Sequence, residues 1–159
     1  WKQVELNDLG KEQAVNLGKT TPYKFDVLFT SDLIRAKESA KLAFPEFKAI
    51  EDNRLRECNY GDLDGGDKNQ VIYEEHIETP FPNGESLQDV EKRIREFLKY
   101  VNENYQGKTI GIIAHRAPQL AIEVITKHIS WEEANANDWR KTGAWQPGWE
   151  YSFKDIDLD

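Results

Sequence analysis

Gly107-Lys-Thr-Ile-Gly-Ile-Ile-Ala-His115-Arg-Ala-Pro118 is the stretch from which the fold of this chain can be predicted. Its uncharged, β-branched centre at 110–114 is typical of a strand buried on both faces of a parallel sheet. Pro118 suits the first turn of a helix, and apolar residues then recur at helical spacing. We therefore expect His115 and Arg116 between the carboxyl end of a strand and the start of a helix, where open α/β sheets place their ligands.

A second strand leads directly into a helix earlier in the chain. Residues 26–31 have a strand-like composition, and residues 32–43 have helical periodicity. Arg35 falls in the first turn of this predicted helix. If the two strands run parallel, Arg35 lies at the same sheet edge as His115.

These strand and helix units predict a three-layer α/β/α domain with a mostly parallel sheet and helices on both faces. We expect residues 1–159 to form a single domain, because the chain is too short to form two hydrophobic cores of adequate size. The pattern also predicts a first helix that stops at Gly18, a short helix over 68–78, a long amphipathic helix over 86–101, and an edge strand within 143–153.

The charge balance excludes several classes of partner. The chain has 21 Lys and Arg against 29 Asp and Glu, a net charge of −8, so it offers no basic surface for nucleic acid or an anionic membrane. It has no apolar run near the roughly 20 residues that a membrane span needs, and Trp1-Lys-Gln-Val-Glu5 does not resemble a signal peptide. With Cys58 as its single cysteine, it has no disulfide framework or zinc cluster, and we expect a cytoplasmic protein.

Methionine is absent from the sequence, including position 1. We therefore expect further residues upstream of Trp1.

Five short segments, in this order, resemble the histidine phosphatase superfamily, also called phosphoglycerate-mutase-like. The three main segments are Ser31-Asp-Leu-Ile-Arg35-Ala36, Leu55-Arg56-Glu57 with Gly61 and Gly65, and Ile113-Ala114-His115. The two supporting segments are Leu6-Asn-Asp-Leu-Gly10 with Gln13 and Ala14, and Pro82-Asn-Gly-Glu-Ser86 with Arg93. Each segment alone is a weak signal, but the combination in this order is specific.

The resemblance implies a metal-independent phosphomonoesterase of the histidine acid phosphatase type, acting on a small phosphorylated metabolite through a phosphohistidine, with no cofactor and no metal. In that family an Arg-His-Gly motif at the end of the first strand supplies the nucleophile. The motif is missing from residues 1–159, whose histidines are His76, His115 and His128. Because the match begins at the first helix, we expect the nucleophilic histidine upstream of residue 1.

The resemblance also implies roles for four residues. Arg35 is expected to clamp phosphate oxygens, and His115 to bind the phosphoryl group during transfer. Glu57 is expected to protonate the leaving alkoxide and then to activate water, while the backbone N–H of Arg116 adds a donor. Considered alone, each side chain also fits a structural role: Arg35 and Glu57 as surface charges, and His115 as a hydrogen-bonding residue at a strand end.

Two features depart from the family pattern. Arg116 replaces the glycine that commonly follows the second histidine, so its guanidinium either narrows the pocket or contacts the substrate. The segment 66–82 is short compared with the insertions of the glycolytic mutases, which favours a phosphatase. A mutase-type phosphotransferase and a non-catalytic phosphate-binding or interaction module remain as alternatives, and the sequence leaves the role of His76 and homodimerisation open.

Overall fold

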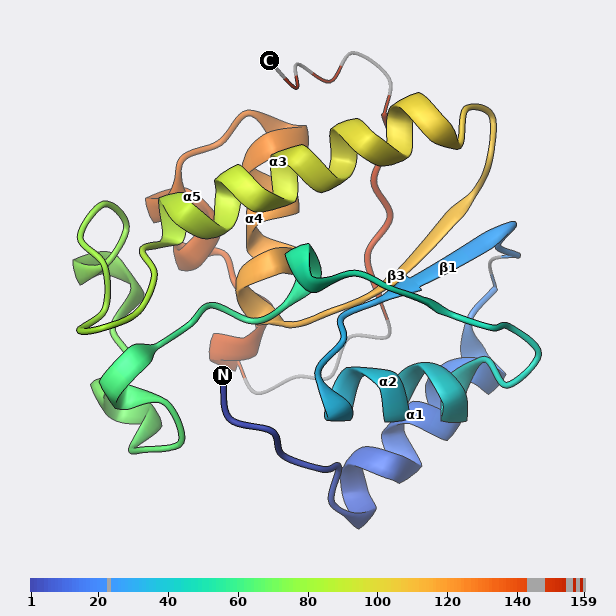
Figure 1. The fold of residues 1–159 in the computed structure, drawn as a ribbon, viewed down its shortest axis with the longest axis horizontal. Helices are drawn as coiled ribbons and strands as arrows, with labels where there is room; N and C mark the ends of the chain where they lie inside the picture. Colours follow the sequence, from blue (N-terminus) through green and yellow to red (C-terminus); the bar gives the residue numbers. More distant parts are fainter. Residues whose placement is uncertain (23, 143–147, 154–155, 157, 159) are drawn as a thin grey trace.

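A three-stranded parallel sheet forms the centre of the computed structural model, which describes residues 1–22, 24–142, 148–153, 156 and 158 (Figure 1). The strands are β1 (Val27–Thr30), β2 (Ile50–Glu51) and β3 (Ile110–Ile113), in the order β2-β1-β3. Both pairings are parallel, and Thr30 of β1 is in register with Ile113 of β3. The carboxyl ends of β1 and β3 therefore lie next to each other, as the sequence predicts.

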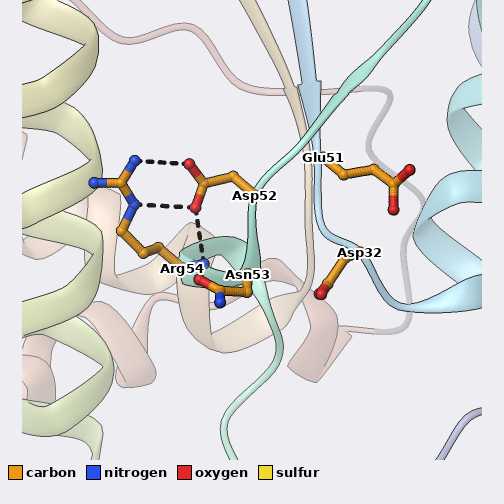
Figure 2. Close-up of a pocket in the computed structure, with 5 residues that line it drawn as sticks. All are labelled: Asp32, Glu51, Asp52, Asn53 and Arg54. Atoms are coloured by element: carbon orange, nitrogen blue, oxygen red, sulfur yellow. Dashed lines mark hydrogen bonds and ion pairs between the residues drawn. The ribbon is translucent and has the colours of Figure 1, made fainter.

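Short 3-10 turns fill much of the chain between β2 and the next long helix. They span Asn53–Leu55, Gly61–Leu63, Lys68–Gln70 and Tyr73–Glu75, and a later one spans Trp139–Thr142. Directly after β2, Asp52 binds the guanidinium and the backbone N–H of Arg54, which fixes the first turn (Figure 2). The short helix predicted over 68–78 is wrong, because two separate 3-10 turns occupy that segment.

Two helices pack on one face of the sheet, namely α1 (Asp8–Thr20) and α2 (Ile34–Ala43) (Figure 1). Their contact depends on Gly18, since an added Cβ there would lie 1.9 Å from the carbonyl oxygen of Ala43. The prediction that Gly18 ends the first helix is therefore wrong. The helix continues to Thr20, and this glycine serves helix packing.

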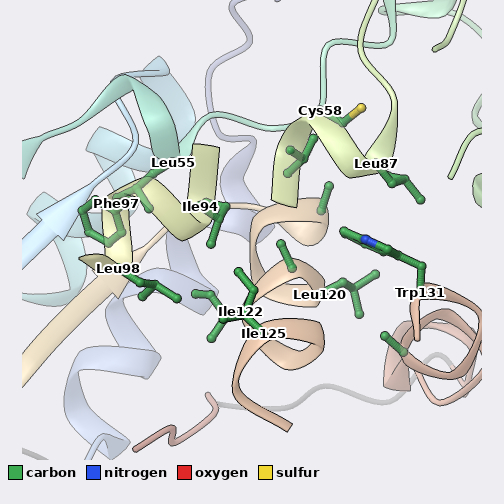
Figure 3. Close-up of a cluster of buried hydrophobic side chains, with 14 of the residues drawn as sticks. Leu55, Cys58, Leu87, Ile94, Phe97, Leu98, Leu120, Ile122, Ile125 and Trp131 are labelled. Carbon is green, nitrogen blue, oxygen red and sulfur yellow. The ribbon is translucent and has the colours of Figure 1, made fainter. Parts of the chain in front are cut away.

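The opposite face carries α3 (Leu87–Asn104) and α4 (Arg116–Lys127), with α5 (Trp131–Ala136) packed beside α4 (Figure 1). Ser86 and Asp89 form a reciprocal capping box that starts α3. The apolar stripe of α3 is buried against α4 and the sheet in the main core (Figure 3). The predicted fold class, α/β with helices on both faces of a parallel sheet, is confirmed.

The tail differs from its prediction. Residues 143–147 lie outside the described residues, and residues 148–153 form no strand. Tyr151 instead packs against the core and bonds α4, donating its hydroxyl proton to Glu123 at 2.6 Å and accepting from Gln119 at 2.7 Å. Among the helices that the structure describes, none has the length and apolar character needed to cross a membrane.

The close approach of α1 and α2 predicts a stability effect at Gly18. We expect Gly18→Ala to lower the free energy of unfolding by about 1–3 kcal/mol, because the new methyl group must push backbone apart. Gly10→Ala, in the same helix, is the control. An added Cβ there meets only side chains of Leu6 and Asn7, at 3.2 Å, and Ala has the better helix propensity. Urea denaturation of both variants tests this, and equal effects would contradict it.

Candidate functional site

His115 lies at the junction of β3 and α4, in the N-cap position of the helix. Its Nε2 is 2.9 Å from the hydroxyl oxygen of Ser31, which follows β1. Burial and the nearby charges of Arg35 and Arg93 lower the pKa of His115 to about 3. The ring is therefore neutral at physiological pH.

Glu57 reaches the same junction from the loop after the first 3-10 turn. Its Oε1 accepts the backbone N–H of Cys58 at 2.8 Å and that of Ala117, in the first turn of α4, at 3.0 Å. His115 makes no side-chain cap to this helix, so Glu57 supplies the cap from 60 residues away. Burial raises the pKa of Glu57 despite these two bonds, which favours the protonated acid.

Arg35 approaches the site from the first turn of α2. Its charge helps to lower the pKa of His115 and offsets part of the rise in the pKa of Glu57, so the guanidinium lies within electrostatic reach of both. Among the described residues it has no hydrogen-bond or ion-pair partner. The structure therefore brings together an uncommitted cation, a neutral imidazole and a carboxyl group, all three named from the sequence.

Arg93 of α3 holds the loop that carries Glu57. Its guanidinium forms a bidentate pair with Glu85, with both N···O distances 2.9 Å. The same group donates to the backbone carbonyls of Arg54, Arg56 and Glu57 at 2.7, 2.8 and 3.0 Å. Because these bonds pin three carbonyls in a segment without regular structure, the position of Glu57 depends on this arginine.

Arg116 has partners inside the protein. Its Nε donates to Asp138 at 2.9 Å, its Nη2 donates to Asn135 at 3.2 Å, and its guanidinium lies 4.0 Å from the ring centroid of Tyr73. The carboxylate of Asp138 is fully buried and also binds Arg140. The side chain of Arg116 therefore joins α4 to the segment after α5. That its guanidinium contacts substrate stays a prediction.

A surface hollow beside the site is lined by Asp32, Glu51, Asp52, Asn53 and Arg54 (Figure 2). Its carboxylates make it poorly suited to a phosphate group. In the part of the chain that the structure describes, no group of three or more His, Cys, Asp or Glu side chains could hold a metal ion.

Comparison with known families gives a match over most of the chain. The model of the histidine phosphatase superfamily (branch 1) matches residues 1–147. The chain belongs to the histidine phosphatase superfamily. The relationship expected from five short segments is thus confirmed by a match that spans the described sheet and both helical layers.

The curated relatives that resemble this chain in sequence include phosphoglycerate mutases. The chain is 32% identical over 156 residues to a 2,3-bisphosphoglycerate-dependent phosphoglycerate mutase of Chelativorans sp. strain BNC1, covering 84% of this chain and 74% of the mutase.

Two solved structures of phosphatases share the fold. One is phosphoserine phosphatase of Entamoeba histolytica in complex with 3-phosphoglyceric acid, with a TM-score of 0.72, 18% identity, and coverage of 85% of this chain and 73% of that chain. The other is a mycobacterial glucosyl-3-phosphoglycerate phosphatase, with a TM-score of 0.69, 21% identity, and coverage of 83% and 72%. At these identities the likeness shows the fold alone.

Several residues around the site had no predicted role. Arg93 and Glu85 belong to a segment that carries the resemblance. Their spacing of eight residues does not indicate that they pair and hold the loop of Glu57. For Ser31 the sequence indicates only a helix cap, at Ser31 or Asp32, and the bond of Ser31 to His115 spans 84 residues. Asp138 gave no signal, because nothing in the sequence connects it to Arg116.

The Arg93 cluster predicts a large loss of stability in Arg93→Met. We expect the free energy of unfolding to fall by about 3–5 kcal/mol, because the largely buried carboxylate of Glu85 loses its cation and three carbonyls lose a donor. Lys37→Met removes a cation from an exposed pair with Glu51 and is the control; it should change stability by less than about 1 kcal/mol. A loss below about 1 kcal/mol in Arg93→Met, measured by urea denaturation, would contradict this role.

Proposed function

We propose that this protein is a phosphomonoesterase that acts on a small phosphorylated metabolite through a phosphohistidine intermediate. The observation that carries the proposal is the convergence of Arg35, Glu57 and His115 at the carboxyl ends of β1 and β3. In this proposal residues 1–159 belong to one catalytic domain. The nucleophile is a histidine upstream of Trp1, because the family motif Arg-His-Gly does not occur in the sequence.

The first chemical step transfers the phosphoryl group to this histidine. A bond forms between the histidine nitrogen and phosphorus, the bond from phosphorus to the ester oxygen breaks, and Glu57 gives its proton to the departing alkoxide. The raised pKa of Glu57 supports this role, because an acid must hold its proton near neutral pH. Arg35 and His115 stabilise the charge on the phosphoryl oxygens as the group moves.

The second step releases phosphate. Glu57, now ionised, takes a proton from water while the water oxygen attacks phosphorus and the bond from phosphorus to nitrogen breaks. The products are inorganic phosphate and a free histidine, and Glu57 returns to its protonated form. The hydrogen bonds from Cys58 and Ala117 stabilise the carboxylate between the two steps.

The charge pairing around Glu57 favours a phosphatase over a bisphosphate-dependent mutase. A bisphosphate substrate needs several uncommitted cations, whereas three arginines near Glu57 already bind carboxylates. The pairs are Arg56 with Asp32, Arg93 with Glu85, and Arg116 with Asp138. The similarity to phosphoglycerate mutases supports phosphoryl transfer between metabolites as the second candidate, and it predicts a phosphorylated isomer as product in place of free phosphate.

The proposal predicts hydrolysis of a generic aryl phosphate by the protein with its natural N-terminal sequence. Activity should persist in a metal chelator, and Arg35→Ala and His115→Ala should each lower kcat/KM by about 100-fold or more, because each removes stabilisation of the transferring charge. Lys37→Met, which removes an exposed cation of the same helix as Arg35, should keep wild-type activity. Chelator-sensitive activity, or full activity in both site variants, would overturn the mechanism.

The role of Glu57 predicts a dependence on the leaving group. Glu57→Gln should slow the first-turnover release of an alkyl alcohol by about 10²–10⁴-fold. Release of a nitrophenol should change far less, because nitrophenolate departs without a proton. Rapid-quench measurements with both esters test this, and Glu103→Gln on the exposed surface of α3 is the control. Equal losses for the two esters would argue against a proton-donor role.

A further inference from the structure

Ser31 occupies a fully buried position between the two strand ends that form the site. Its residue exposure is 0%, and its backbone N–H donates to the carbonyl of Ile113 at 2.9 Å, which extends the pairing of β1 with β3. A polar side chain so completely buried needs hydrogen-bond partners. The hydroxyl of Ser31 has two, and one of them is His115.

A buried hydroxyl proton needs an acceptor, and this need indicates the direction of the bond to His115. The hydroxyl oxygen of Ser31 accepts the backbone N–H of Leu33 at 3.2 Å, at the start of α2. Its proton remains available, and the atom to receive it is Nε2 of His115 at 2.9 Å. Among the described residues, the ring has no second hydrogen-bond partner. A neutral imidazole that accepts at Nε2 carries its proton on Nδ1.

We propose that Ser31 is a positioning residue that holds His115 in the Nδ1–H tautomer, so that the ring offers an N–H donor to the phosphoryl group. This inference rests on the proposed function for the identity of the group that receives the bond. The same hydroxyl also accepts the backbone N–H of Leu33, which is the N-cap residue of α2, the helix that carries Arg35. Ser31 thus sets the relative position of the cation and the neutral donor.

The tautomer can be measured without any catalytic assay. In protein labelled with ¹⁵N at histidine, long-range ¹H–¹⁵N correlation spectra distinguish a ring protonated at Nδ1 from one protonated at Nε2. The chain has three histidines, and a His115→Gln spectrum assigns the signals of interest. We expect wild-type His115 to be neutral at pH 7 and protonated at Nδ1. A ring protonated at Nε2 would overturn the proposal at once, even if no Ser31 variant folds.

Removal of the hydroxyl should change the tautomer and the rate together. We expect Ser31→Ala to lower the ratio of the Nδ1–H to the Nε2–H form about tenfold, the factor that one hydrogen bond of ordinary strength supplies. The kcat for an alkyl phosphate should fall by a similar factor of about ten, with KM little changed. Ser31→Thr, which keeps the hydroxyl, should restore the wild-type tautomer.

Thr30→Val is the matched control. Thr30 is also buried, and its hydroxyl donates to the carbonyl of Ser31 but not to His115. This variant should lose some stability and keep both the tautomer and kcat. A folded Ser31→Ala protein with an unchanged His115 tautomer would overturn the proposal, whatever its activity. An expected tautomer shift in a protein inert toward every phosphomonoester would uphold the positioning role and refute the phosphatase function instead.

Discussion

The bidentate pair between Arg93 and Glu85 is the interaction on which the arrangement of this site depends. Regular structure supplies the strand ends and helix starts, but the segment that follows β2 has only short turns to define its path. The carboxylate of Glu85 fixes the guanidinium of Arg93, whose remaining N–H groups donate to three backbone carbonyls of this segment. These bonds hold the segment in place, as the backbone hydrogen bonds between strands do in a sheet. Since Glu85 lies just before the long helix α3 and Arg93 lies in its second turn, this helix sets the position of the loop that carries Glu57.

Burial shifts the pKa values of Glu57 and His115 in opposite directions, and both shifts favour the neutral form. It raises the pKa of Glu57 and lowers that of His115, so that both neutral forms are favoured. Burial thus favours the protonated acid of Glu57 and the neutral imidazole of His115, beside a guanidinium that is always charged. In the proposed mechanism, a dianionic phosphoryl group entering this environment meets two groups whose neutral forms are favoured, together with the guanidinium of Arg35.

The sequence predicts the parts of this structure that depend on local pattern. The strand that ends before His115, the helix that carries Arg35 and the capped helix starting after Ser86 all follow from periodicity and caps, and the family resemblance adds Glu57. The parts it missed depend on pairs far apart in the chain. The bond of Ser31 to His115 and the anchoring of Arg116 by Asp138 have no spacing to reveal them. Gly18 was misread because a glycine that ends a helix and one that admits a neighbouring backbone look alike in sequence.

The carboxyl group of Glu57 also serves as the cap of α4. Active-site residues often weaken the folds that carry them, so that drift toward a more stable protein erodes activity. Here the fold retains a use for the same side chain through its bond to Ala117. A protein lineage that no longer needed the proposed reaction would still gain stability from a hydrogen-bond acceptor at this position. A glutamate conserved among inactive descendants would therefore indicate helix capping as much as catalysis.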